Sequence, residues 1–92
     1  MESGLESHLD DTMKNTSDAM GILFADSHGL SLGCRGTLTD RHAGVVTELA
    51  RHASKLSADA SDVPVICLES EAGNILIRMQ NDLTVALHKM PS

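Results

Sequence analysis

The sequence holds 92 residues, enough for one domain and too few for two separate cores. Hydrophobic residues make up 41 % and charged residues 22 %, proportions that exclude wholesale disorder. With 13 acids, 7 bases and a single aromatic residue, the net charge is −6, so neither nucleic acid nor an anionic membrane is an expected partner. No apolar run approaches the roughly 18–20 residues of a membrane span, and the acidic start is unlike a signal or transit peptide, so no direct membrane insertion is expected.

The two cysteines, Cys34 and Cys67, form neither a C-x-x-C pair nor a disulfide framework. Both fall within apolar runs, so we expect reduced, buried thiols of a cytosolic protein.

Residues 1–15 are predicted to form a helix, because Leu5, Leu9 and Met13 recur every fourth residue and residues 3–6 have the form of a capping box. A helix of this length is marginal alone, so it should dock on the rest of the domain. We therefore predict a single domain over 1–92, with an N-terminal docking helix at 1–15 and a core at 19–90.

Residues 19–25 run apolar without alternation, which favours a strand buried on both faces. Residues 26–29 have the composition of a turn. Leu30, Leu32 and Cys34 then alternate with polar or small residues, which predicts a half-buried second strand and a hairpin.

A second, longer helix is predicted from Thr39 to Leu56, with Thr37 or Thr39 as its N-cap. His42 falls on its apolar face, where we interpret it as a satisfied or rim histidine, with pH sensing as the less favoured alternative. The other residues expected on this face are Val45, Val46, Leu49, Ala50, Ala53 and Leu56. The polar side is expected to carry Thr47, Glu48, Arg51, His52, Ser54 and Lys55.

Residues 57–62 are predicted to form a polar loop, followed by three strands at 63–68, 75–80 and 83–88. Asn81 and Asp82 suit a tight two-residue hairpin turn between the last two strands. The order α-β-β-α-β-β-β implies an α/β (α+β) sandwich: a five-stranded, mainly antiparallel sheet with helices packed on it in two or three layers.

Two constellations of reactive residue types have structural interpretations. The run Asp26-Ser27-His28 carries the residue types of a catalytic triad, but triads converge from separated positions, so we prefer turn chemistry. Glu48 and His52 lie one helical turn apart and lack a third metal ligand, so we prefer a solvated helix face. We therefore expect no catalytic, cofactor-binding or metal-binding residue.

The strand at 63–68 is the informative element. Pro64 has no N–H for a ladder, which places the strand at a sheet edge. Val65 to Leu68 is apolar on both faces, although edge strands normally carry charges that prevent association. We expect this strand to be covered, either by a terminal segment of this chain or by another subunit that pairs with it.

Six blocks of the sequence resemble one family: LDDTMKN at 9–15, DSHGL at 26–30, LGCRGTL at 32–38, HAGV at 42–45, CLES at 67–70 and VALHKM at 85–90. They are similar to the fifth subunit of Ragulator, the hepatitis B virus X-interacting protein family. The resemblance implies a roadblock/longin-type domain whose third strand pairs edge to edge with a partner while the second helices pack together. Mapped onto this sequence, the subunit interface consists of Val63, Val65, Ile66, Cys67, Leu68, Val45, Leu49 and His52.

The resemblance also implies a non-enzymatic scaffold subunit that pairs with the fourth Ragulator subunit, another roadblock protein. A lipidated first subunit wraps this pair and a second roadblock pair, and holds the otherwise cytoplasmic proteins on the late endosomal and lysosomal membrane. The complex binds Rag GTPases and recruits target-of-rapamycin complex 1 when amino acids are plentiful. Survivin and the hepatitis B virus X protein are further implied partners.

Other functions stay open at this point. A roadblock-type homodimer could regulate a small GTPase directly, and a stable dimer of the purified chain would favour it. An anti-apoptotic cofactor that binds survivin and the viral X protein is a second alternative. A sensor or enzyme of profilin-like or PAS-like architecture would need a pocket with convergent polar groups, which the sequence does not indicate.

Overall fold

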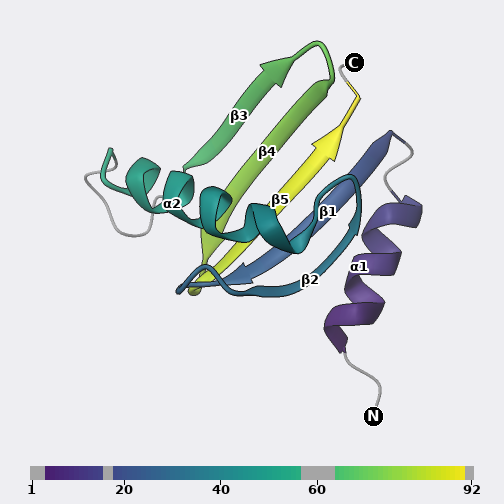
Figure 1. Ribbon diagram of the computed structural model, residues 1–92, viewed down its shortest axis with the longest axis horizontal. Coiled ribbons are helices and arrows are strands. Elements are labelled where there is room, and N and C mark those ends of the chain that lie inside the picture. Colours follow the sequence, from purple (N-terminus) through teal and green to yellow (C-terminus); the bar gives the residue numbers. More distant parts are fainter. Residues whose placement is uncertain (1–3, 16–17, 57–63, 91–92) are drawn as a thin grey trace.

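The computed structural model describes residues 4–15, 18–56 and 64–90. Within them the element order is the predicted one, with a 3-10 turn added before the second helix (Figure 1). The elements are α1 (Gly4–Asn15), β1 (Ala19–Asp26), β2 (Ser31–Gly36), η1 (Asp40–His42), α2 (Ala43–Ser54), β3 (Val65–Ser70), β4 (Gly73–Gln80) and β5 (Leu83–Lys89). The predicted loop at 57–62 and Val63 lie outside the described residues.

The five strands form one sheet in the order β2-β1-β5-β4-β3, and every pairing is antiparallel. β3 therefore lies at an edge, as predicted, while β1 and β5 lie inside the sheet. Pro64 comes immediately before β3 instead of within it, because a residue without an N–H contributes no donor to the ladder.

Alternate residues of β1 supply two cores on opposite faces of the sheet. Leu23 and Ala25 pack in the core beneath α2, whereas Ile22 and Phe24 pack with Leu9 of α1. The molecule therefore has three layers, with α2 on one face and α1 on the other. The unbroken apolar run of β1 follows from burial on both faces, which confirms that prediction.

α1 docks on the sheet as predicted, because Leu9 is fully buried and Met13 is half-buried. Asp10 adds an ion pair of 2.9 Å with Arg35 on β2. The predicted capping residue Ser3 lies outside the described residues, and the described elements that α1 packs against most are β1 and β2. None of the described helices is long and apolar enough to cross a membrane.

The rest of the face that carries α1, over β5, β4 and β3, lacks a comparable helix among the described residues. We call this area the rear face; its side chains are Val65, Cys67, Leu76, Arg78, Val85 and Leu87. Most of them line a shallow hollow of about 280 Å³.

The prediction of one helix from Thr39 to Leu56 is wrong at both ends. At the start, the His42 ring accepts a hydrogen bond from the Thr39 N–H, and a 3-10 turn precedes α2. At the end, Lys55 and Leu56 donate to carbonyls three residues back, so the last turn tightens after Ser54. Leu56, predicted on the apolar face, is 89 % exposed.

The buried stripe of α2 also differs from the prediction. It consists of Ala43, Val46, Thr47 and Ala50, which follow the i, i+3, i+4, i+7 spacing of a single face. Thr47, predicted on the polar side, is therefore buried, and Val45 on the opposite side of the helix is 61 % exposed. Small alanines on the buried stripe let the helix lie close to the sheet.

The simple alternation predicted for the second strand is wrong because β2 carries a bulge. Phe24 pairs with Gly33 and Ala25 with Ser31, so Leu32 is one extra residue on β2. Cys34 shares the α2 face with Leu23, while Leu32 is exposed.

Neither cysteine is buried as expected. Cys34 is half-buried and Cys67 is exposed on the rear face, and both thiols are free.

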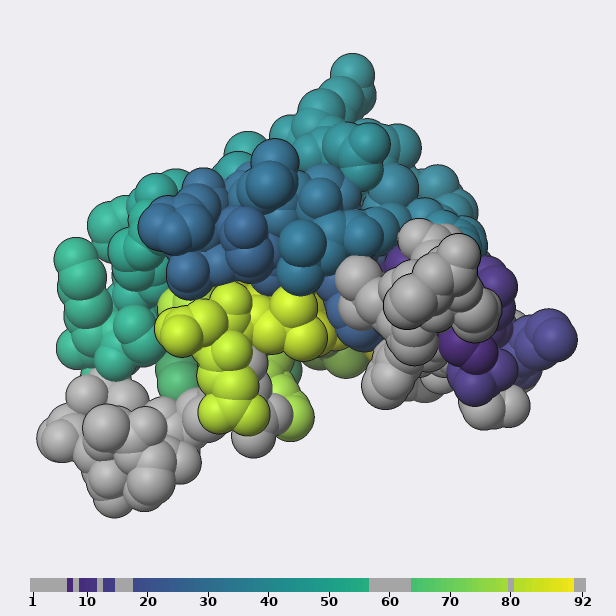
Figure 2. Space-filling model, turned by 90° about the horizontal axis from the view of Figure 1, so that it is seen from below, coloured from purple at the N-terminus to yellow at the C-terminus, as the bar shows by residue number. Residues whose placement is uncertain are grey.

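The two-residue turn predicted at 81–82 is confirmed. Asn81 and Asp82 have φ angles of 55° and 64°, as a tight hairpin turn requires of both central residues. Figure 2 shows this turn, in yellow-green, beside the blue β1–β2 turn. The pairing of Asp26 with Leu83 joins the two turns through the sheet.

Candidate subunit interface

β3 presents both a strand edge and apolar side chains to solvent. Val65 is 56 % exposed, Leu68 is 42 % exposed, and Cys67 is exposed as well. Ile66 differs from them because it is half-buried and packs against the core beneath α2. Within the described sheet β4 is the only neighbour of β3, so the outer backbone groups of β3 face outward.

α2 continues this apolar surface beside β3. Val45 is exposed and Leu49 half-buried, and both line a hollow of about 260 Å³ together with Leu68. We call this hollow the inner hollow. The structure thus brings together three residues that the family resemblance placed in an interface, two from the helix and one from the strand.

The other described members of the predicted interface do not line the inner hollow. Because strand residues alternate, Val65 and Cys67 project from the rear face. His52 lies near Glu48, with 3.7 Å between His52 Nε2 and Glu48 Oε1. We define the pairing surface by the described members of the predicted set: Val65, Ile66, Cys67, Leu68, Val45, Leu49 and His52.

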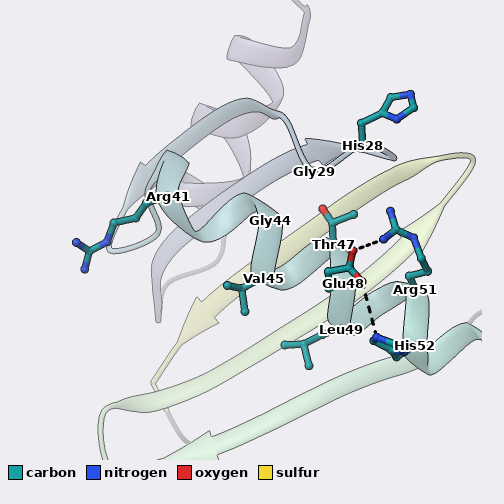
Figure 3. Close-up of a pocket in the computed structure, with 10 residues that line it drawn as sticks. All are labelled: His28, Gly29, Arg41, Gly44, Val45, Thr47, Glu48, Leu49, Arg51 and His52. Carbon is teal, nitrogen blue, oxygen red and sulfur yellow. Dashed lines mark hydrogen bonds and ion pairs between the residues drawn. The ribbon is translucent and has the colours of Figure 1, made fainter.

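A second, more open hollow of about 560 Å³ borders α2 on its outer side, and Figure 3 shows its lining residues. Glu48 forms an ion pair with Arg51, whose second guanidinium nitrogen donates to the Ser27 carbonyl at 2.7 Å. This contact ties α2 to the β1–β2 turn. In the described ranges 4–15, 18–56 and 64–90, no three potential metal ligands gather here or elsewhere.

The Asp26-Ser27-His28 run forms a turn, as predicted. The Asp26 carboxylate accepts the backbone N–H groups of His28 and Leu30, each at 2.9 Å. These bonds, that from Leu30 foremost, lower the pKa of the Asp26 carboxyl. The Asp26 carboxylate therefore has a structural role, which is to stabilise the turn.

Asp40 joins η1 to β2. Its carboxylate accepts hydrogen bonds from the Ser31 hydroxyl at 2.7 Å and the Cys34 thiol at 3.4 Å, and these bonds lower the pKa of Asp40. Burial, followed by the neighbouring Asp40, raises the pKa of the Cys34 thiol. A thiol with a raised pKa is a poor nucleophile, so Cys34 has the chemistry of a structural residue.

Sequence reasoning missed a polar cluster at the inner hollow. His88 of β5 is only 9 % exposed and its ring meets the Thr37 hydroxyl and the Ala72 carbonyl. α2 lies over the face of β5 that carries Thr84, Ala86 and His88, and these residues are buried, whereas Leu83, Val85 and Leu87 on the other face are half-buried. The missing signal was the central position of β5, between β1 and β4 and beneath α2.

A five-stranded antiparallel sheet with a helix on each face and an open β3 edge is the architecture of a roadblock domain. Two solved structures share this fold. The Roadblock/LC7 domain from Streptomyces avermitilis superposes with a TM-score of 0.77 at 16 % identity, over 96 % of this chain and 79 % of that one. Myxococcus xanthus MglB superposes with a TM-score of 0.69 at 13 % identity, over 95 % and 72 %.

Sequence comparison assigns the chain within this fold class. The family model for Ragulator complex protein LAMTOR5 matches residues 1–89. The Ragulator complex protein LAMTOR5 of Xenopus tropicalis is 55 % identical, and the homolog from Nematostella vectensis is 49 % identical, each over 92 residues and the full length of both chains. The chain belongs to the LAMTOR5 family of Ragulator complex proteins, which confirms the resemblance.

Proposed function

We propose that this Ragulator subunit is a non-enzymatic scaffold that pairs with another roadblock subunit through the edge of β3 and the exposed side of α2. The observation that best supports this proposal is the open, apolar edge of β3. Val65 and Leu68 are 56 % and 42 % exposed, next to Val45 at 61 %. The first four residues of this edge strand, Val65 to Leu68, carry no charge, and such a segment would invite uncontrolled association unless a partner covers it. Contiguous exposed apolar surface of this kind marks protein interaction sites.

Pairing of this kind extends the sheet by main-chain hydrogen bonds while side-chain contacts select the partner. Val45 and Leu49 stand beside β3, so a partner strand on that edge would bring the partner's own helix against them. The family resemblance points to the fourth Ragulator subunit as that partner.

The rear face supports a second contact, with the lipidated first subunit. Its hollow is lined by Val65, Leu76, Val85 and Leu87, and apolar side chains left at a surface gain stability when an extended partner covers them. A wrapping chain would bind both this pair and the second roadblock pair, and would hold them at the late endosomal and lysosomal surface.

In this assembly the subunit helps to anchor and activate Rag GTPases, and so to recruit target-of-rapamycin complex 1 in response to amino acids. Its contribution is to hold a binding geometry. Survivin and the hepatitis B virus X protein are additional proposed partners, carried only by the family resemblance.

The test substitutes exposed residues of the pairing surface, so that the substitutions leave the core and the folding of the subunit intact. Cys67→Lys and Val45→Asp place a charge where a partner would bury it, at a cost of several kcal/mol. Leu30→Asp is the matched control, because Leu30 is 65 % exposed and lies in the turn that leads into β2, the edge strand opposite β3. Ile66→Lys is avoided because Ile66 contributes to the core.

Each variant is co-expressed with the fourth Ragulator subunit and examined by size-exclusion chromatography with light scattering. We expect a heterodimer for the unaltered chain and for Leu30→Asp, and separate subunits for Cys67→Lys and Val45→Asp. Unchanged pairing by both charged variants would overturn the proposed surface. A stable dimer of the chain alone, with its own affinity for a small GTPase, would instead favour the homodimer function.

A further inference from the structure

The outer backbone groups of β3 belong to alternate residues of the strand. The β3–β4 ladder ends at Ser70 and Gly73, which flank a two-residue turn and therefore hydrogen-bond to each other. Because hydrogen-bonded and non-hydrogen-bonded pairs alternate along an antiparallel ladder, Val65, Cys67 and Glu69 occupy non-hydrogen-bonded positions toward β4. Their N–H and C=O groups point to the open edge, where a partner strand would bond to them.

The ladder between β4 and β5 gives the same assignment. Its last pair, Gln80 and Leu83, flanks the two-residue turn at 81–82, so the even-numbered residues of β4 bond to β5. Those even-numbered residues are the ones that lie opposite the three outward residues of β3. Only the odd-numbered residues of β4 remain to bond to β3, which again leaves the same three residues of β3 without a backbone partner in this sheet.

Glu69 is the one charged residue of β3, and it is exposed. Alternation places its side chain on the same face of the sheet as those of Val65 and Cys67. Across the ladder it meets the uncharged Asn74, and Lys89 lies one strand beyond, on β5. No described residue forms an ion pair with Glu69. Its carboxylate is therefore left for a group that a partner brings to this edge.

The direction of the partner strand decides what Glu69 meets. A partner of the same fold that pairs through its own third strand is related to this subunit by an approximate two-fold axis, so the two strands run antiparallel. Because Glu69 is near the C-terminal end of β3, it lies opposite a residue near the start of the partner strand. A Lys or Arg at that position would form a cross-strand pair of opposite charges with Glu69.

A second copy of this chain would meet Glu69 with an aliphatic side chain instead. The antiparallel register that uses all three outward residues places the two Cys67 residues opposite each other, and each Glu69 opposite Val65 of the other copy. Arg78 lies beyond that Val65, on β4, and already has an interaction of its own. Pairing of two copies would thus cover two carboxylates with no base directly opposite either of them.

We propose that Glu69 determines the choice of partner: it favours a roadblock strand that carries Lys or Arg opposite it, and it disfavours pairing between two copies of this chain. The inference rests on the proposed pairing function. A cross-strand pair of opposite charges stabilises the interface, whereas a carboxylate covered without a base loses hydration and gains no compensating contact. The apolar residues of β3 supply contact area, and the charge near its end supplies selectivity.

The first test measures the affinity of the full chain for the fourth Ragulator subunit and compares Glu69→Lys with Glu71→Lys. Glu71 is also exposed and lies in the turn beyond β3, so its variant has the same net charge and leaves the ladder untouched. We expect about tenfold weaker pairing for Glu69→Lys, because two like charges replace the pair of opposite charges. The affinity of Glu71→Lys should stay close to that of the unaltered chain.

Charge reversal in the partner identifies the base. Each Lys and Arg near the start of the partner's edge strand is replaced by Glu, one at a time, and the product is combined with Glu69→Lys. We expect one replacement to restore the affinity of Glu69→Lys and to weaken pairing with the unaltered chain. An equal loss of affinity in Glu69→Lys and Glu71→Lys, or no restoration by any reversal, would overturn the inference while the pairing function stands.

Self-association provides a readout that needs no partner. Sedimentation equilibrium of the isolated chain should show about tenfold stronger self-pairing for Glu69→Val than for the unaltered chain or for Glu71→Val. Equal self-association of all three proteins would show that Glu69 does not disfavour the pairing of two copies, and would overturn the inference. Failure of the unaltered chain to pair with the fourth Ragulator subunit would instead overturn the proposed function, and this inference with it.

Discussion

Thr37 and His88 lie 51 residues apart in the chain and meet in a 2.6 Å hydrogen bond between Thr37 Oγ1 and His88 Nδ1. The other ring nitrogen donates to the Ala72 carbonyl, so in the neutral ring the Thr37 hydroxyl is the donor. One imidazole thus joins the segment before η1, the end of β5 and the β3–β4 turn. The edge strand of the pairing surface is held at this point to the centre of the sheet.

Thr37→Val should destabilise the fold by about 1–2 kcal/mol, because it leaves the nearly buried Nδ1 of His88 without its donor. Thr37→Ser keeps the hydroxyl and should cost much less. Urea denaturation of both variants measures the difference. Equal midpoints for Val and Ser would show that the hydrogen bond contributes nothing to stability.

Two glycines should respond to alanine with opposite signs. At Gly21 a Cβ would lie 2.7 Å from the Leu38 nitrogen and 2.8 Å from the Thr37 nitrogen, and backbone atoms cannot move aside cheaply. We expect Gly21→Ala to cost about 3 kcal/mol.

Gly44, in the first turn of α2, has open space around its Cβ position. Gly44→Ala should stabilise the fold by about 0.5–1 kcal/mol, because alanine loses less backbone entropy in a helix. Thermal unfolding of the two variants tests the pair, and a loss of stability in Gly44→Ala would contradict the geometry of the helix start.

The element order, the sheet edge and the tight turn at 81–82 could be predicted because each depends on local chemistry: apolar runs, a proline and turn residues. The buried face of α2 could not be predicted from the sequence. Thr47 is buried and Val45 exposed because the sheet accepts the stripe that contains two alanines, and that choice depends on tertiary fit. The bulge at Leu32 similarly depends on the register with β1.

The sequence was sufficient to place β3 in the candidate interface, but not to predict which face of the sheet each of its side chains lies on. Apolar residues on a proline-marked edge were enough to indicate β3, but alternation sends Val65 and Cys67 to the rear face and Leu68 to the inner hollow. His42 and His88 converge on that hollow from elements far apart in the chain, so no sequence spacing could bring them together.

Two buried hydroxyl groups should lower the stability of the fold. Among the described residues, Thr47 Oγ1 and Thr84 Oγ1 are buried without a hydrogen-bond partner. Valine has nearly the same shape and no polar atom, so Thr47→Val and Thr84→Val should each stabilise the fold by about 1 kcal/mol. Chemical denaturation checks this, with Thr37→Val as the control of opposite sign. Destabilisation by both variants would mean that the hydroxyls have partners, such as buried water.

The β1–β2 turn should lose stability in acid through Asp26. Its pKa is lowered in the fold, chiefly by the Leu30 N–H, so the native state favours the carboxylate. The contribution is therefore complete above the ordinary aspartate pKa of about 3.9 and is lost as pH falls below it. Asp26→Asn retains an acceptor oxygen without a charge, whereas Asp26→Ala retains neither.

We expect the urea midpoint of the unaltered chain to exceed that of Asp26→Asn at neutral pH, and the gap to narrow as pH falls below the ordinary aspartate pKa of about 3.9, because the unfolded chain then takes up a proton that the native carboxyl binds less readily. Asp26→Ala should remain the least stable of the three at every pH, because the His28 and Leu30 amides then lose their shared acceptor. A constant gap between the unaltered chain and Asp26→Asn from neutral pH to about pH 3 would show that the carboxylate charge is not what the turn uses, and that the acceptor geometry alone holds it.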